Sequence, residues 1–169
     1  EPAVTPLQGA ARAASYAGGG NMTRLLIVSC SRAKRPDLGS LPAIDRYDGP
    51  LFRMLRRARG AGLLIDVQVY ILSAKHGLID EGWMIHDYDQ AMTPARALEL
   101  AGPATMTLWR WMGQHPECMD VFVNLGQGYA PALAGFDGWC LRQGVIVTQA
   151  AGGIGERLAQ TKRWLEVRP

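Results

Sequence analysis

Four clusters of polar and reactive side chains, each following a short apolar run, are the parts of this sequence best suited to chemistry. The clusters are residues 29–34 (SCSRAK), 73–77 (SAKHG), 124–129 (NLGQGY) and 149–155 (QAAGGIG). In open α/β folds the carboxyl ends of parallel strands meet at one edge of the sheet, and ligands bind there. We therefore expect the four clusters to form one site for a small anionic or nucleobase-like ligand.

Cys30, Lys75 and His76 are the candidate catalytic residues. A thiol beside an imidazole base can act as a nucleophile, and Asp87 or Asp89 could orient the imidazole. Lysine can stabilise developing negative charge, and histidine titrates near neutral pH. The alternatives are that Cys30 is a small buried apolar residue and that His76 is a hydrogen-bonded turn residue.

The candidate ligand-binding residues offer hydroxyl groups, positive charge or backbone freedom at the same edge. Lys34 could pair with a phosphate or carboxylate. Gly153 and Gly155 precede a helix, where free N–H groups favour an anion, although a tight turn with positive φ is the alternative. The complete set is Ser29, Ser31, Lys34, Tyr47, Ser73, Gly77, Asp87, Tyr88, Gly126, Tyr129, Gly153 and Gly155.

The sequence indicates no metal site and no cofactor. The three histidines, His76, His86 and His115, lack the i, i+4 spacing of a helical zinc pair. An iron site built from Cys30, His76 and Asp87 is a weaker alternative.

Short apolar runs alternate with amphipathic segments, which predicts strands alternating with helices. Strands are expected at 25–28, 67–72, 121–123 and 145–147, and a loop of about 20 residues after the second strand. Helices are expected at 50–59, 94–112, 131–143 and 154–165. Thr93 should cap the second helix, and Gly102-Pro103 should kink or split it. The pattern predicts a three-layer Rossmann-like α/β fold with a mainly parallel sheet of about four strands.

The length of 169 residues suits one domain, which we expect at 22–169. Residues 1–21 are rich in Ala and Gly and are expected to be a flexible arm or a cloning remnant. No apolar run approaches the ~20 residues of a membrane span. Three widely spaced cysteines favour a reducing, cytoplasmic setting without disulfides.

The net charge of +3 permits an anionic partner without requiring one. Four arginines crowd the first expected helix and are interpreted as a solvated face. Contact with nucleic acid is the alternative interpretation. These arginines are Arg53, Arg56, Arg57 and Arg59.

Several segments resemble the YaaA-like superfamily. The segments that carry the resemblance are YILSAKHGLI at 70–79, IHDYDQAM at 85–92, and GIGERL at 153–158 with Lys162 and Trp164-Leu165. The opening Ser29-Cys30-Ser31 with Lys34, and YDGPLF at 47–52, resemble a compact bacterial and phage domain of unknown function. The chain departs from the superfamily pattern in having His76 where an aromatic is usual, and Asp89 where a basic residue is usual. It is also much shorter than the YaaA protein.

The resemblance implies a connection to nucleic acids or nucleobases, because YaaA is associated with peroxide resistance, iron limitation and DNA binding. Other relatives accompany machinery for 7-deazaguanine bases. We therefore expect an enzyme with hydrolase- or transferase-like chemistry on a nucleobase or nucleotide. The alternatives are a non-enzymatic DNA-binding protein of oxidative stress and an iron-handling protein.

Overall fold

Strand β1 (Arg24–Ser29) forms the centre of a five-stranded sheet in a computed structural model that describes residues 24–168. The strand order is β4-β3-β1-β6-β7. Strands β3 (Val67–Ser73), β6 (Asp120–Asn124) and β7 (Ile146–Gln149) run parallel to β1. These four parallel strands overlap the four that the sequence predicts, so the chain is an α/β protein with a mostly parallel sheet.

Three short strands were not predicted from the sequence. Strand β4 (Gly77–Asp80) pairs antiparallel with β3 and forms one edge of the sheet. Strands β2 (Leu41–Pro42) and β5 (Met84–Ile85) form a separate two-stranded ribbon. The segment after β3, expected to be one long loop, therefore contains two strands, and the main sheet has five strands rather than about four.

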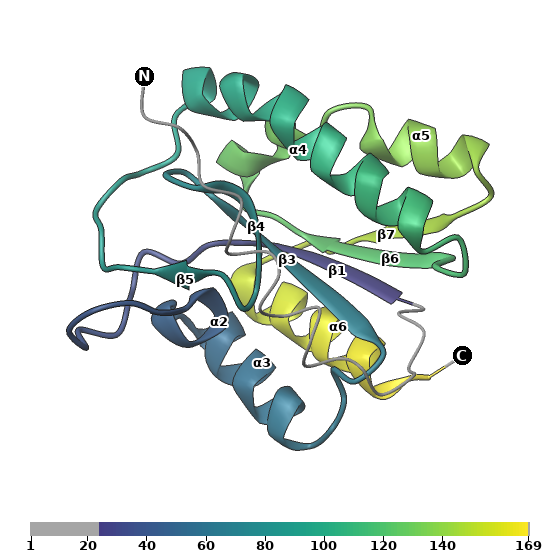
Figure 1. The fold of residues 1–169 in the computed structure, drawn as a ribbon. Coiled ribbons are helices and arrows are strands. Elements are labelled where there is room, and N and C mark those ends of the chain that lie inside the picture. The colour runs from purple at the N-terminus through teal and green to yellow at the C-terminus, as the bar shows by residue number, and fades with distance from the viewer. Residues whose placement is uncertain (1–23, 169) are drawn as a thin grey trace.

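Helices cover both faces of the sheet (Figure 1). One face carries α4 (Pro94–Gln114) and α5 (Phe136–Arg142), with the 3₁₀ helix η1 (Gln127–Leu133) beside α4. The other carries α2 (Ala43–Arg46), α3 (Pro50–Gly60) and α6 (Ile154–Glu166). No helix among residues 24–168 is both long enough and apolar enough to cross a membrane.

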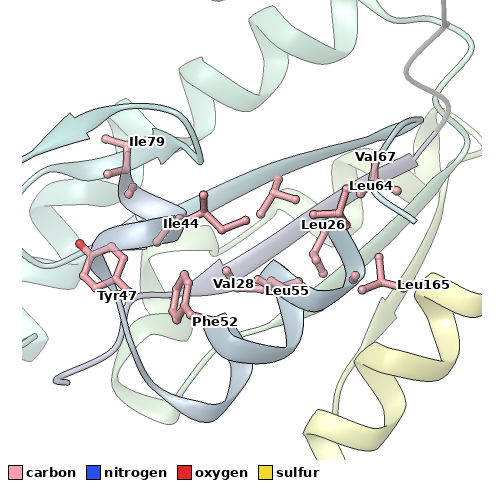
Figure 2. Close-up of a cluster of buried hydrophobic side chains, with 14 of the residues drawn as sticks. Leu26, Val28, Ile44, Tyr47, Phe52, Leu55, Leu64, Val67, Ile79 and Leu165 are labelled. Atoms are coloured by element: carbon pink, nitrogen blue, oxygen red, sulfur yellow. The ribbon is translucent and has the colours of Figure 1, made fainter. Parts of the chain in front are cut away.

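The apolar side chains of β1 are buried on both faces of the sheet, as expected of a central parallel strand. Leu26 and Val28 belong to the core beneath α3 and α6, which also includes Phe52 and Leu165 (Figure 2). Leu25 and Ile27 point the other way, into the core beneath α4 and α5. The two cores fix the orientation of β1 and so fix where its polar carboxyl end lies.

The structure shows no division at Gly102-Pro103 but does divide another of the expected helices. The helix expected at 131–143 is divided into η1 and α5, because Gly135 has a left-handed backbone (φ 84°) that an α-helix cannot contain. Helix α4, in contrast, continues through Pro103 without a break. The carbonyl that proline leaves without an intrahelical donor belongs to Glu99, which is exposed, so water can hydrogen-bond to it. Thr93 caps this helix as predicted, accepting a hydrogen bond from the Arg96 N–H (3.1 Å).

The chain leaves β1 and β6 in opposite directions. After β1 it crosses one face through α3 to reach β3, and after β6 it crosses the other face through α5 to reach β7. Because the connections diverge, a crevice opens between the carboxyl ends of these two adjacent strands. This topological switch point is the usual ligand site of open α/β sheets. The arm expected at 1–21 lies outside the described residues.

Candidate functional site

A cavity of about 280 Å³ opens at the switch point, between the carboxyl ends of β1 and β6. The first turns of α3 and α6 form its remaining walls. We call it the switch-point pocket, and its lining residues are Ser29, Cys30, Ser31, Gly49, Pro50, Leu51, Phe52, Asn124, Gly126, Ile154, Arg157 and Leu158. Four of the predicted site residues, Ser29, Cys30, Ser31 and Gly126, are thus brought together at one cavity.

The two serines after β1 hold neighbouring loops around this pocket. Ser29 Oγ accepts a hydrogen bond from the Gly126 N–H (3.1 Å), which ties β1 to the loop after β6. Ser31 Oγ accepts one from the Gly49 N–H (3.0 Å), directly before α3. Both hydroxyl groups therefore already have partners within the protein. These hydrogen bonds shape the pocket, and direct ligand contact by the two serines stays a prediction.

Asn124 and Arg157 contribute polar groups that the sequence analysis did not select. Asn124 donates its amide N–H to Thr161 Oγ1 (3.0 Å), which leaves the amide oxygen as its acceptor. Arg157 donates through one terminal nitrogen to the Leu125 carbonyl, while its buried Nε has no hydrogen-bond partner. The pocket wall therefore includes one arginine and one asparagine among apolar side chains.

The helix that begins at Ile154 is less available to an anion than expected. The Glu156 carboxylate accepts a hydrogen bond from the Gly153 N–H (2.7 Å), so a negative group already lies at this N-terminus. Gly152 has φ 89°, which fits the alternative of a tight turn. Gly155 lies within α6. The N-terminus of α3 carries no acidic residue in its first turn. The backbone N–H groups of that turn have no acceptor within the helix.

A cluster of hydroxyl groups and one thiol lies beside the pocket. Cys30 Sγ is 3.2 Å from the Tyr129 hydroxyl. The Tyr88 hydroxyl is 2.5 Å from that of Tyr47 and 2.8 Å from Ser73 Oγ. Residues predicted from five separate segments therefore meet, and the loop containing Tyr47 does reach this edge of the sheet (Figure 2).

The three phenols of this cluster are neutral at physiological pH. Burial, followed by the nearby Cys30, raises the pKa of Tyr88 to about 12. Burial also raises the pKa values of Tyr47 and Tyr129 above the ordinary tyrosine value. A neutral phenol keeps its proton and can donate a hydrogen bond to Cys30 or to a ligand.

His76 differs from its predicted role. Its ring packs edge-on against Tyr88, with centroids 5.2 Å apart, and its Nε2 is buried without a hydrogen-bond partner. Burial and the neighbouring Lys75 lower the pKa of His76, so the imidazole is neutral at pH 7. Within residues 24–168 no aspartate hydrogen-bonds to this ring. Asp87 instead accepts a hydrogen bond from the Tyr88 backbone N–H (2.9 Å). The partner of the Cys30 thiol is Tyr129 rather than His76.

The remaining predicted residues surround Tyr88 or support the fold. Lys34 Nζ lies 4.3 Å from the centroid of the Tyr88 ring, and Lys75 Nζ lies 5.4 Å from it. Gly77, with φ 75°, makes the turn into β4. In the described part of the chain, no group of three His, Cys, Asp or Glu side chains could hold a metal ion, so Cys30, His76 and Asp87 do not form the alternative iron site.

The arginine face of α3 is largely engaged within the protein. Arg56 pairs with Asp48 (2.5 Å) and donates to two backbone carbonyls. Arg53 lies 3.5 Å from the same carboxylate, and Arg59 pairs with Asp45 (2.7 Å). Arg57 is exposed. Three of these four arginines thus serve intramolecular contacts, which leaves less positive charge for nucleic acid than the sequence suggests.

Comparison with known proteins places this fold and pocket in a sequence family without assigning a function. No curated protein and no solved structure matches the chain. A model of a family of unknown function, DUF6884, matches residues 25–130. The match spans β1 to η1 and so includes the β1 and β6 walls of the pocket, the start of α3 and the Tyr88 cluster. It covers more than half of the sequence, and the chain therefore belongs to the DUF6884 family.

Proposed function

We propose that this chain is an enzyme that binds a nucleobase or nucleotide in the switch-point pocket and acts on it beside Cys30. The observation that carries the proposal is the position of the pocket. A cavity lies where β1 and β6 diverge, and it has a thiol on its wall. Three-layer Rossmann-like folds bind their ligands at this switch point, and we propose the same for this fold.

The chemistry of the pocket wall favours a flat heterocycle. Leu51, Phe52 and Leu158 supply apolar surface on two sides. The Arg157 Nε–H is an unpaired donor, and the Asn124 amide oxygen is an acceptor. A nucleobase has apolar faces, with donors and acceptors on its edge, and arginine commonly donates to ring nitrogen and carbonyl acceptors of guanine.

Cys30 is the candidate nucleophile. Cys30 lines the pocket, and its thiol contacts the Tyr129 hydroxyl, which lies next to the pocket. The neutral phenol of Tyr129 can donate a hydrogen bond to negative charge that develops during attack by sulfur. Lys75 and His76 both contact the Tyr88 ring rather than the thiol. We assign Lys75 to charge compensation and the neutral His76 to hydrogen bonding, and neither to activation of the thiol.

The resemblance to the YaaA-like superfamily supports the same ligand class. Relatives of that superfamily occur with the enzymes of 7-deazaguanine modification, and membership of DUF6884 is compatible with such a role. Three free cysteines fit a reducing compartment, where a thiol nucleophile stays active. A non-enzymatic DNA-binding role receives less support, because the arginines of α3 are mostly paired.

A thermal-shift screen tests the proposal directly. The full chain is heated with nucleobases, nucleosides, nucleotides and 7-deazaguanines, and ligands that bind only the native state raise the melting temperature. We expect Arg157→Met to abolish the shift. Arg163→Met, which removes an exposed arginine from the same helix, should leave it intact. If no compound of these classes shifts the wild-type protein, the proposed ligand class is wrong.

Catalysis by Cys30 requires a separate measurement. A compound found in the screen is incubated with the wild-type chain and with Cys30→Ser, and its conversion is followed by mass spectrometry. We expect the serine variant to bind the compound but to convert it much more slowly. Equal conversion by both proteins would remove Cys30 from the mechanism.

A further inference from the structure

Two lysines from different loops converge on one tyrosine ring beside the switch-point pocket. Lys34 Nζ is 4.3 Å and Lys75 Nζ is 5.4 Å from the Tyr88 ring centroid. Neither ammonium group forms an ion pair with any carboxylate of residues 24–168. Asp87 and Asp89, which flank Tyr88 in the sequence, are exposed and pair with neither lysine.

The backbone holds both lysines in this arrangement. Lys34 forms an antiparallel bridge with Tyr47. The turn that carries Lys75 is fixed by Arg96, which donates to the Ala74 carbonyl (2.7 Å) and to the Lys75 carbonyl (3.0 Å). These hydrogen bonds fix the backbone from which each lysine side chain extends.

Each ammonium group lies near the Tyr88 ring without a carboxylate partner among residues 24–168, and bringing two like charges to one ring costs electrostatic energy. The Tyr88 ring offsets part of this cost through cation–π interaction, and Lys34 also donates to the Arg32 carbonyl (3.3 Å). A phosphate group would offset the remainder, because it carries up to two negative charges and several acceptor oxygens. The absence of a protein carboxylate leaves this position open to an anionic ligand.

Cys30 connects the lysine pair to the pocket. Its thiol lines the cavity, and it also interacts with the Tyr88 hydroxyl. A ligand that fills the pocket and extends past Cys30 therefore reaches the ring on which both lysines converge.

We infer that Lys34 and Lys75 form a phosphate subsite and that the ligand is a nucleotide. Its base lies in the switch-point pocket and its phosphate lies between the two ammonium groups. This inference rests on the proposed function, and it narrows the ligand class from nucleobases in general to phosphorylated nucleosides.

Titration calorimetry of the full chain with the four common ribonucleosides and their 5′-monophosphates tests the inference. We expect one nucleotide to bind the wild-type chain about tenfold or more tightly than its nucleoside, as charge-assisted hydrogen bonds to phosphate require. The double variant Lys34→Ala/Lys75→Ala should lose this difference and retain the affinity for the nucleoside. Lys162→Ala, an exposed lysine on α6, is the matched control and should change neither affinity. If the alanine variant does not fold, Lys34→Gln/Lys75→Gln removes the charges while retaining most of each side chain.

The outcomes separate the inference from the proposed function. A nucleoside that binds as tightly as its nucleotide, or a double variant that weakens both ligands equally, overturns the phosphate subsite and leaves the pocket intact. Inorganic phosphate that binds as tightly as the nucleotide would overturn the nucleotide assignment. If none of these nucleosides and nucleotides binds the wild-type chain, the inference fails, and the thermal-shift screen with nucleobases and 7-deazaguanines then decides the proposed function.

Discussion

The three cysteines should differ sharply in their reaction with iodoacetamide, because only Cys30 lies at a cavity. Cys118 and Cys140 are 1% and 0% exposed, respectively. Burial raises the pKa of each of these two thiols to about 12, from an ordinary value of 9.0. Since the thiolate is the reacting form, a thiol with a pKa of about 12 has about a thousandfold less thiolate at pH 8 than one with the ordinary pKa of 9.0. We therefore expect one cysteine of the native protein to be alkylated rapidly.

The assay is alkylation of the full chain at pH 8, stopped at intervals and read by peptide mass spectrometry. We expect Cys30 to be labelled first. Cys118 and Cys140 should react about a thousandfold more slowly, or only as fast as the protein unfolds. Cys30→Ser should remove the rapid phase, and guanidinium chloride should bring all three thiols to similar rates. A ligand in the switch-point pocket should slow the labelling of Cys30 alone.

One result would refute this reasoning. If Cys118 or Cys140 in the native protein reacted within about tenfold of the rate at Cys30, burial would not control thiol reactivity in this fold. The packing of the core beneath α4 and α5, to which both cysteines belong, would then be looser than the structure shows.

Three further predictions concern stability. Gly152→Ala should destabilise the protein by about 1–2 kcal/mol in urea unfolding, because φ is 89° and the new Cβ would lie 2.2 Å from Glu156 Oε2. Gly155→Ala is its control, since that Cβ meets nothing within 4 Å in a helix, and it should be neutral or stabilising by up to about 1 kcal/mol. Arg46→Met should lower the free energy of unfolding by about 3 kcal/mol or more, because this fully buried side chain donates to three carbonyls of the 35–39 loop. A loss below about 1 kcal/mol in the same urea assay would contradict this prediction. The pKa of Tyr88 is raised to about 12 from 10.0, so the native state keeps a proton that the unfolded state loses, and stability should fall as pH rises from 10 to 12. Tyr88→Phe should make that fall shallower in alkaline thermal melts, and an unchanged slope would show that other groups cause it.

The parallel strands were predictable because their local pattern and their tertiary environment agree. The continuous apolar run at 25–28 indicates burial on both faces, and β1 is buried on both. Strand β4 was missed because it has only four residues and follows a polar turn. The sequence held one indication of this strand. Gly77, four residues after Ser73, can adopt the positive φ that a hairpin turn requires.

The gathering of polar segments at one sheet edge was predictable, but the contacts among them were not. The parallel order of the strands places the carboxyl ends of β1, β3 and β6 side by side, independently of the side chains that follow them. The meeting of Tyr47 with Tyr88 depends on the β2–β5 ribbon, which brings together segments 41 residues apart. No local pattern encodes that pairing, and so the sequence favoured a Cys–His pair where the structure has a thiol among phenols.

Arg157 shows where a closer reading of helical spacing would have found a site residue. Ile154, Arg157 and Leu158 lie three and four residues apart, so they share one face of α6. That face continues to the buried Thr161 and Leu165, and a charged residue on an inward face requires a partner. The Leu125 carbonyl satisfies one nitrogen of Arg157, but Nε remains buried and unpaired at the cavity wall. Burying an unpaired donor is costly, and helical spacing therefore marks Arg157 as a residue to test in the ligand screen.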